Sequence, residues 1–121
     1  MGRPIVHFEI NGKDAPALRS FYGETFGWEI GEPVPGAWNS YATIQTGVPG
    51  GISGGIGDSP DGYDAPVTFY VGVTDMPKAF GTIEKLGGSK VMGPEQVPGG
   101  PVIGYFRDPG GHVVGLVEIP E

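Results

Sequence analysis

Residues 4–11 alternate between apolar and polar side chains, a pattern that predicts a β-strand. One face of this strand carries three apolar residues, Val6, Phe8 and Ile10. His7 and Glu9 fall on the opposite face. We therefore expect the apolar face to pack against a core, which leaves the polar face for other tasks.

After Asp14 the apolar positions take the longer spacing of an amphipathic helix. Asp14 is suited to cap this helix, Pro16 stands in its first turn, and Gly27 is suited to end it. Further strands are expected at residues 28–30, 41–45 and 51–56. The first half of the chain therefore predicts the order β-α-β-β-β.

The second half repeats this order. A strand is expected at residues 66–73, and Asp75 caps a helix that ends at Gly87-Gly88. Further strands are expected at residues 90–92, 102–106 and 112–119. Residues 58–64, polar and rich in proline and glycine, are expected to link the halves.

The two halves align without gaps at an offset of 61 residues. Eight pairs are identical: Val6/Val67, Phe8/Phe69, Asp14/Asp75, Pro16/Pro77, Gly27/Gly88, Pro33/Pro94, Gly50/Gly111 and Gly54/Gly115. A repeat of this kind indicates two structural modules. The halves differ where His7 aligns with Thr68 and where Gly57 aligns with Glu118. We look for function at these differences.

Composition narrows the function classes. The chain has 121 residues, the size of one domain, and no segment as apolar and long as a membrane span. Its net charge of −7 argues against nucleic acid or an anionic membrane as a partner, and most simply serves solubility. The absence of cysteine excludes disulfides and thiolate sites. With no apolar signal segment, these features favour a cytoplasmic protein.

Glycines are dense between residues 47 and 62, but a phosphate-binding loop is not indicated. The segment lacks the Gly-Lys-Ser/Thr ending, and no helix follows it. We interpret Gly50 and Gly111 as equivalent turns, and Gly54 and Gly115 as sites of close backbone packing.

Three runs of residues resemble the vicinal oxygen chelate superfamily, which includes glyoxalase I, extradiol dioxygenases, bleomycin resistance proteins and methylmalonyl-CoA epimerase. They are residues 6–10 (VHFEI), residues 21–28 (FYGETFGW) and residues 106–112 (FRDPGGH) with the closing GLVE at 115–118. The resemblance covers the whole chain. It is specific for the fold and weak for the reaction, because the superfamily hosts many chemistries.

The resemblance implies an α+β fold in which two βαβββ modules in tandem, about 1–60 and 63–121, form one glyoxalase-like domain over residues 1–121. Their curved mixed sheet surrounds a cleft, and a homodimer is expected. Family members place four metal-site positions on the first and last strands of the modules. In this sequence they fall at His7, Gly57, Thr68 and Glu118.

His7 and Glu118 are suited to hold a divalent ion such as Zn²⁺, Fe²⁺, Mn²⁺, Ni²⁺ or Co²⁺, and Glu118 is also suited to act as a catalytic base. No organic cofactor is indicated. Gly57 has no side chain to offer and Thr68 is a poor ligand. His7 and Glu118 are therefore also consistent with a hydrogen-bonded pair in a cleft that has lost its metal.

Five further residues are expected to bind a small-molecule substrate: Glu9, Thr68, Tyr70, Tyr105 and Trp38. Trp38 stands in a loop that has no aromatic counterpart in the second half, whereas Tyr70 and Tyr105 equally suit a core. His112 is interpreted as an exposed turn residue, and Trp28 as core.

Three functions stay open at this point. The first is a metal-dependent lyase, isomerase or dioxygenase whose substrate presents two neighbouring oxygens to the ion. The second is a metal-free protein of the bleomycin-resistance type that sequesters a small cationic or aromatic molecule. The third is an accessory domain that serves to bind a partner. The missing ligands at Gly57 and Thr68 favour the second over the first.

Overall fold

The computed structural model describes residues 2–35, 40–58 and 66–120. Two compact units share the chain: a first unit, His7–Val67, and a second unit, Thr68–Glu121 together with Met1–Val6. No helix in the described ranges has the length and apolar character needed to cross a membrane. Both units contain helix and strand, which confirms the expected α+β class.

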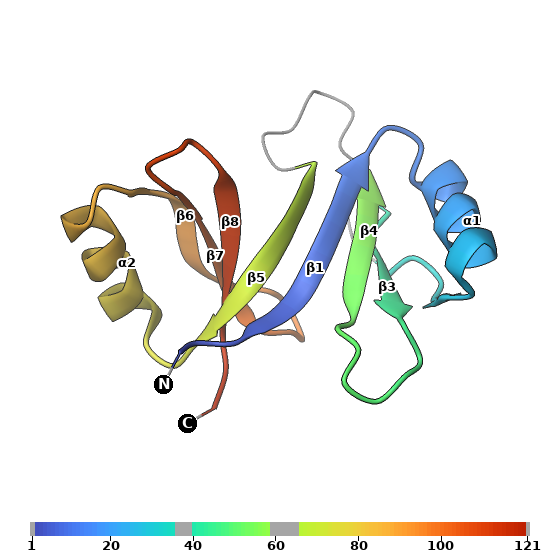
Figure 1. Ribbon diagram of the computed structural model, residues 1–121, viewed down its shortest axis with the longest axis horizontal. Helices are drawn as coiled ribbons and strands as arrows, with labels where there is room; N and C mark the ends of the chain where they lie inside the picture. Colours follow the sequence, from blue (N-terminus) through green and yellow to red (C-terminus); the bar gives the residue numbers. More distant parts are fainter. Residues whose placement is uncertain (1, 36–39, 59–65, 121) are drawn as a thin grey trace. The chain divides into compact units, whose positions relative to one another are not determined.

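The first unit contains one helix and four strands (Figure 1). In chain order they are β1 (Ile5–Gly12), α1 (Ala15–Phe26), β2 (Glu29–Ile30), β3 (Ala42–Gln45) and β4 (Gly54–Asp58). The strand order is β2-β3-β4-β1, with β1 parallel to β4 and the other neighbours antiparallel. This is the βαβββ order that the sequence predicts.

Helix α1 begins and ends at the residues that the sequence indicates. The Asp14 carboxylate accepts a hydrogen bond from the Ala17 N–H at 3.1 Å, and Gly27 ends the helix with a φ of 70°. The helix packs on the apolar face of the sheet. The core there consists of Ile10, Ala15, Ile44 and Ile56, with Phe8, Leu18, Tyr22, Trp28 and Ile30 packed against it. Trp28 is therefore partly buried and packs against the core, in line with the expectation.

The second unit repeats this construction. Its elements are β5 (Val67–Val73), α2 (Met76–Lys85), β6 (Ser89–Gln96), β7 (Val102–Arg107) and β8 (Val113–Glu118), and its strand order is β5-β8-β7-β6. Asp75 caps α2 by accepting a hydrogen bond from the Lys78 N–H at 3.1 Å. The core consists of Val73, Met76, Phe80 and Leu116. Strand β6 is longer than the three residues that the sequence indicates.

The last strands of the two units do not follow the gapless alignment. Gly12 pairs with Asp58, and its counterpart Val73 pairs with Glu118. Asp58 is therefore the structural equivalent of Glu118, at an offset of 60 rather than 61, and the expected match of Gly57 with Glu118 is wrong. The physical reason is that the units differ in length in two places. Ala42 pairs with Ile56 and Gly104 with Leu116, so the stretch before the third strand is one residue longer in the second unit and the loop before the last strand is two residues shorter, a net shift of one.

Candidate functional site

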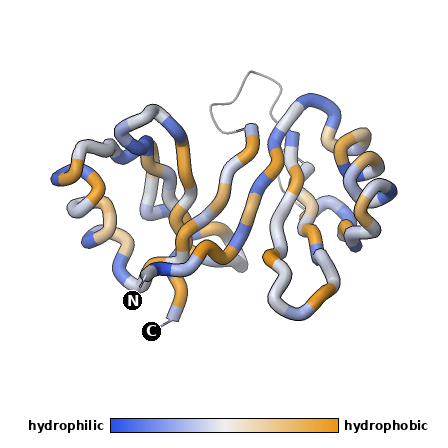
Figure 2. Tube along the Cα trace, viewed as in Figure 1, coloured by the Kyte–Doolittle hydropathy of each residue, from blue (hydrophilic) through white to orange (hydrophobic). Residues whose placement is uncertain are grey.

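One face of the first unit is polar, and it lies opposite helix α1. Ile10 of β1 and Ile56 of β4 point into the helix-side core, so their neighbours along the strands point the other way. We call the residues on that side of the first unit, His7, Glu9, Asn11, Tyr41 and Gly55, the polar face. Figure 2 shows the hydropathy changing from residue to residue along β1.

Two members of the polar face are buried although they are polar. Glu9 and Asn11 are each only 7% exposed. Burial of a carboxylate is unfavourable unless polar groups compensate it, so Glu9 is an unusual residue for a buried position of a strand. This face is therefore the strongest candidate for function in the first unit.

Hydrogen bonds connect the side chains of the polar face. His7 Nε2 lies 2.8 Å from the Tyr41 hydroxyl, and the Asn11 amide donates a hydrogen bond to Glu9 Oε1 at 3.0 Å. Tyr41 is a member that the sequence did not single out. The alternation around the buried Ala42 could have placed it on this face, but only with the pairing of β3 and β4 already known.

Burial sets the protonation of two of these groups. It lowers the pKa of His7, and this effect outweighs the neighbouring Glu9 charge, which favours the imidazolium. Burial raises the pKa of Tyr41 strongly, and the Glu9 charge raises it further. At neutral pH the face therefore presents a neutral imidazole beside a protonated phenol.

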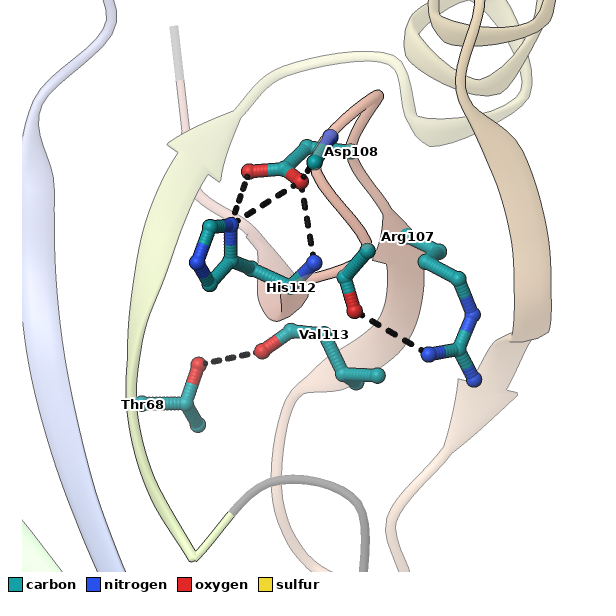
Figure 3. Close-up of polar contacts among 7 residues, drawn as sticks. Thr68, Arg107, Asp108, His112 and Val113 are labelled. Carbon is teal, nitrogen blue, oxygen red and sulfur yellow. Dashed lines mark hydrogen bonds and ion pairs between the residues drawn. The ribbon is translucent and has the colours of Figure 1, made fainter.

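In the second unit, three of the expected substrate-binding residues are buried and hydrogen-bonded. The Thr68 hydroxyl donates to the Val113 carbonyl at 2.8 Å (Figure 3). Tyr70 and Tyr105 are joined through their hydroxyls, with ring centroids 5.6 Å apart. The structure thus brings Tyr70 and Tyr105 together, while the donor of Thr68 is used by the backbone.

The carboxylate of Glu118 lies at the beginning of helix α2. Its Oε2 accepts a hydrogen bond from the Met76 N–H at 3.2 Å. Asp58 does the same in the first unit, where its Oδ1 accepts from the Ala15 N–H at 2.8 Å. Negative charge is favourable at a helix N-terminus, so both carboxylates have a structural task. His7 belongs to the first unit and Glu118 to the second, and a shared metal or catalytic role for them stays a prediction.

The donor set does not fit a resident metal ion. Among the described residues there is no group of three or more His, Cys, Asp or Glu side chains that could hold one. The polar face supplies two such side chains, His7 and Glu9, whereas catalytic metal sites usually supply three protein ligands. The donor of Thr68, a predicted metal-site position, is directed at the Val113 carbonyl.

Two further residues that the sequence singled out are Trp38 and His112. Trp38 lies outside the described residues. His112 is an exposed turn residue, as expected, and its Nδ1 lies 3.1 Å from the Asp108 carboxylate (Figure 3). Hydrogen bonds from the His112 backbone, more than the nearby imidazole, hold the pKa of Asp108 below its usual range.

A hollow of about 190 Å³ lies on the helix side of the second unit. It is formed by the end of α2, with Ile83 and Leu86, and by the turn after β7, with Asp108 and Pro109. Sites for organic ligands usually enclose about 300–1,000 Å³, and this hollow contains none of the expected site residues. It does not compete with the polar face as a candidate site.

Comparison with known proteins identifies a family and a fold. The model of the Glyoxalase/Bleomycin resistance protein/Dioxygenase superfamily matches residues 4–116. A protein of solved structure from Bacillus halodurans C-125 is 12% identical with a TM-score of 0.74, covering 100% of this chain and 97% of that one. A superfamily member from Vibrio splendidus 12B01 is 12% identical with a TM-score of 0.67, covering 98% and 100%.

Methylmalonyl-CoA epimerase from Mycobacterium tuberculosis is also similar, with 16% identity, a TM-score of 0.69 and coverage of 97% of this chain and 88% of that one. Identities of this size support the fold and leave the reaction open. No curated protein matches the chain significantly.

Proposed function

We propose that this chain, which belongs to the Glyoxalase/Bleomycin resistance protein/Dioxygenase superfamily, binds a small neutral or cationic organic molecule through its polar face and needs no resident metal ion to do so. The observation that carries the proposal is the buried polar row of β1. Glu9 and Asn11 are polar although each is only 7% exposed, and they lie on the face of β1 opposite the helix-side core.

The charges on the face define the class of ligand. The polar face contains the carboxylate of Glu9 but no lysine or arginine, and the whole chain carries a net charge of −7. A field of this sign attracts cations and repels anions. A variant of methylmalonyl-CoA epimerase from Streptomyces coelicolor has been solved in complex with 2-nitronate-propionyl-CoA, and the coenzyme A part of that ligand carries negative phosphate groups. We propose that such polyanionic thioesters are not ligands of this chain.

A metal-assisted enzyme is the second candidate, and the state of His7 favours it. Burial lowers the pKa of His7, and a neutral imidazole is the form that both a metal ligand and a general base require. An enzyme of this kind would need further ligands beyond His7 and Glu9. This requirement is what places it second.

The test uses protein without a histidine tag. A library of small cationic, neutral and anionic aromatic compounds is screened by the shift in unfolding temperature, and binding is then quantified by calorimetry. We expect cationic or neutral compounds to stabilise the protein, and Glu9→Gln to weaken that binding. Glu24→Gln, at an exposed position of α1, is the matched control and is expected to bind normally.

Metal content separates the two candidates. We expect the purified protein to contain no stoichiometric metal before or after incubation with Zn²⁺, Mn²⁺, Fe²⁺, Ni²⁺ and Co²⁺. Stoichiometric metal that is lost in His7→Ala would overturn the metal-free proposal and support the enzyme. Selective stabilisation by anionic compounds would overturn the proposed ligand class.

A further inference from the structure

The described residues do not provide enough ligands for a metal ion, and His7 has a different partner, Tyr41. We propose that Tyr41 occupies the position at His7 that a metal ion would otherwise take on the polar face. The Tyr41 hydroxyl donates a hydrogen bond to His7 Nε2 and fixes the imidazole, and Gly55 is the residue that makes room for the Tyr41 ring. Tyr41 is thus a positioning residue for His7. The inference adds to the proposed function, since it explains how the face is organised without an ion.

The first observation is the contact itself. The Tyr41 hydroxyl lies 2.8 Å from His7 Nε2, a full hydrogen-bond contact between residues 34 positions apart in the chain. An imidazole nitrogen that accepts a hydrogen bond uses the same lone pair that a metal ion would take. While Tyr41 donates to Nε2, that nitrogen is not available to an ion.

The second observation is the space above Gly55. Gly55 stands in register with Glu9 on the neighbouring strand, so both belong to the polar face. A Cβ atom at residue 55 would overlap the Tyr41 hydroxyl and lie only 2.7 Å from Cε1 of its ring. Any side chain at this position, a metal-binding one included, is incompatible with Tyr41 in its present place.

The third observation is that the second unit also covers a glycine of its last strand with a tyrosine, although this tyrosine comes from β5, the counterpart of β1, and not from the counterpart of β3. Gly115 stands in register with Tyr70, and a Cβ atom there would lie 2.5 Å from Cδ2 of the Tyr70 ring. The Tyr70 hydroxyl in turn reaches the Tyr105 hydroxyl. In both units, therefore, a glycine of the last strand is covered by a tyrosine whose hydroxyl is bonded to another side chain.

Nitrogen NMR of the histidine rings tests the proposal directly. The chain has two histidines, so a ¹⁵N-histidine-labelled sample without a tag gives only two ring systems, and the exposed His112 is an internal reference. We expect His7 to carry its proton on Nδ1, with Nε2 unprotonated and accepting. In Tyr41→Phe the His7 signals should move while those of His112 stay in place. Tyr22→Phe, on α1, is the matched control and should leave both unchanged.

Titration with Zn²⁺ alone gives a second readout at the same signals. One net hydrogen bond stabilises by about 1 kcal/mol, so its removal should lower the Zn²⁺ concentration that shifts the His7 signals by roughly fivefold in Tyr41→Phe. Gly55→Ala should act in the same direction because its Cβ displaces Tyr41. Gly81→Ala, where a Cβ meets no atom within 4 Å, is its control.

Three results would overturn the inference: a proton on His7 Nε2 in the wild type, His7 signals that are identical in Tyr41→Phe, or unchanged Zn²⁺ binding at His7 in both variants. If Gly55→Ala does not fold, Tyr41→Phe still decides, because it removes one oxygen atom. None of these results depends on whether a ligand is found, so failure of this inference and failure of the proposed function are distinguishable.

Discussion

Replacing Glu118 distinguishes its contribution to the stability of helix α2 from the metal-binding or catalytic role that the sequence suggests. In the structure its carboxylate accepts from the Met76 N–H at 3.2 Å, at the positive end of α2. Loss of a helix-capping acceptor costs about 0.5–2 kcal/mol, and loss of a favourable charge at a helix N-terminus about 0.3–1 kcal/mol. We therefore expect Glu118→Ala to lower the free energy of unfolding by about 1–2 kcal/mol. Glu118→Gln, which keeps an acceptor oxygen, should lower it by about half as much.

Asp58 provides the matched comparison in the first unit. Its contact with the Ala15 N–H is shorter, 2.8 Å, so Asp58→Ala should cost at least as much as Glu118→Ala. The assay is urea unfolding followed by circular dichroism on tag-free protein, with ligand binding measured on the same samples. In thermal unfolding of the same samples, each 1 kcal/mol of lost stability should lower the unfolding temperature by about 3–5 °C in a chain of this length.

The refuting result is equally specific. If Glu118→Gln keeps full stability but abolishes ligand or metal binding, the carboxylate serves the site and not the helix. If neither Glu118→Ala nor Asp58→Ala changes the free energy of unfolding by more than about 0.3 kcal/mol, capping from the last strand contributes nothing measurable.

Three further predictions concern stability. Burial holds the folded-state pKa of His7 below its unfolded value of 6.5, so the unfolded chain binds more protons at pH values between the two pKa values. The free energy of unfolding should therefore fall as pH drops through 6.5, and His7→Gln should reduce this loss in a pH series of urea unfolding. Asp108 has a folded-state pKa below 3.8, so its contribution to the free energy of unfolding should be present above pH 3.8 and vanish as pH falls through the folded-state pKa. In Asp108→Asn this contribution should be missing at all pH values in the same assay. Gly54→Ala should cost about 1–3 kcal/mol in thermal or urea unfolding, because its Cβ would lie 2.6 Å from the Phe8 carbonyl oxygen; a neutral result would show that β4 shifts freely.

Much of the fold follows from local rules that the sequence displays. The alternation of β1 places His7 and Glu9 opposite the helix-side core, and the caps at Asp14 and Asp75 begin both helices as expected. These features depend on neighbours in the chain. Gly54 also packs against the backbone of β1, as its place in a glycine-rich strand indicates.

The site was harder to predict because it depends on pairing between distant segments. Connecting segments of different length move the last strand by a net one residue, and a one-residue step turns every side chain to the other face. The gapless repeat therefore matched Glu118 with Gly57, whereas its equivalent is Asp58. Tyr41 gave no sequence signal, because its contact with His7 depends on a glycine 14 residues away in the chain.

The two capping carboxylates also bear on how such a protein folds during its synthesis. Each ties the last strand of its unit to the first turn of its helix, across 43 residues for Asp58 and 42 for Glu118. A helix emerging from the ribosome must therefore wait for the end of its own unit before its cap is complete. A segment that carries one such unit with its helix cap complete must extend through this final carboxylate. The carboxylate thus marks the minimum length at which a unit contains its own cap.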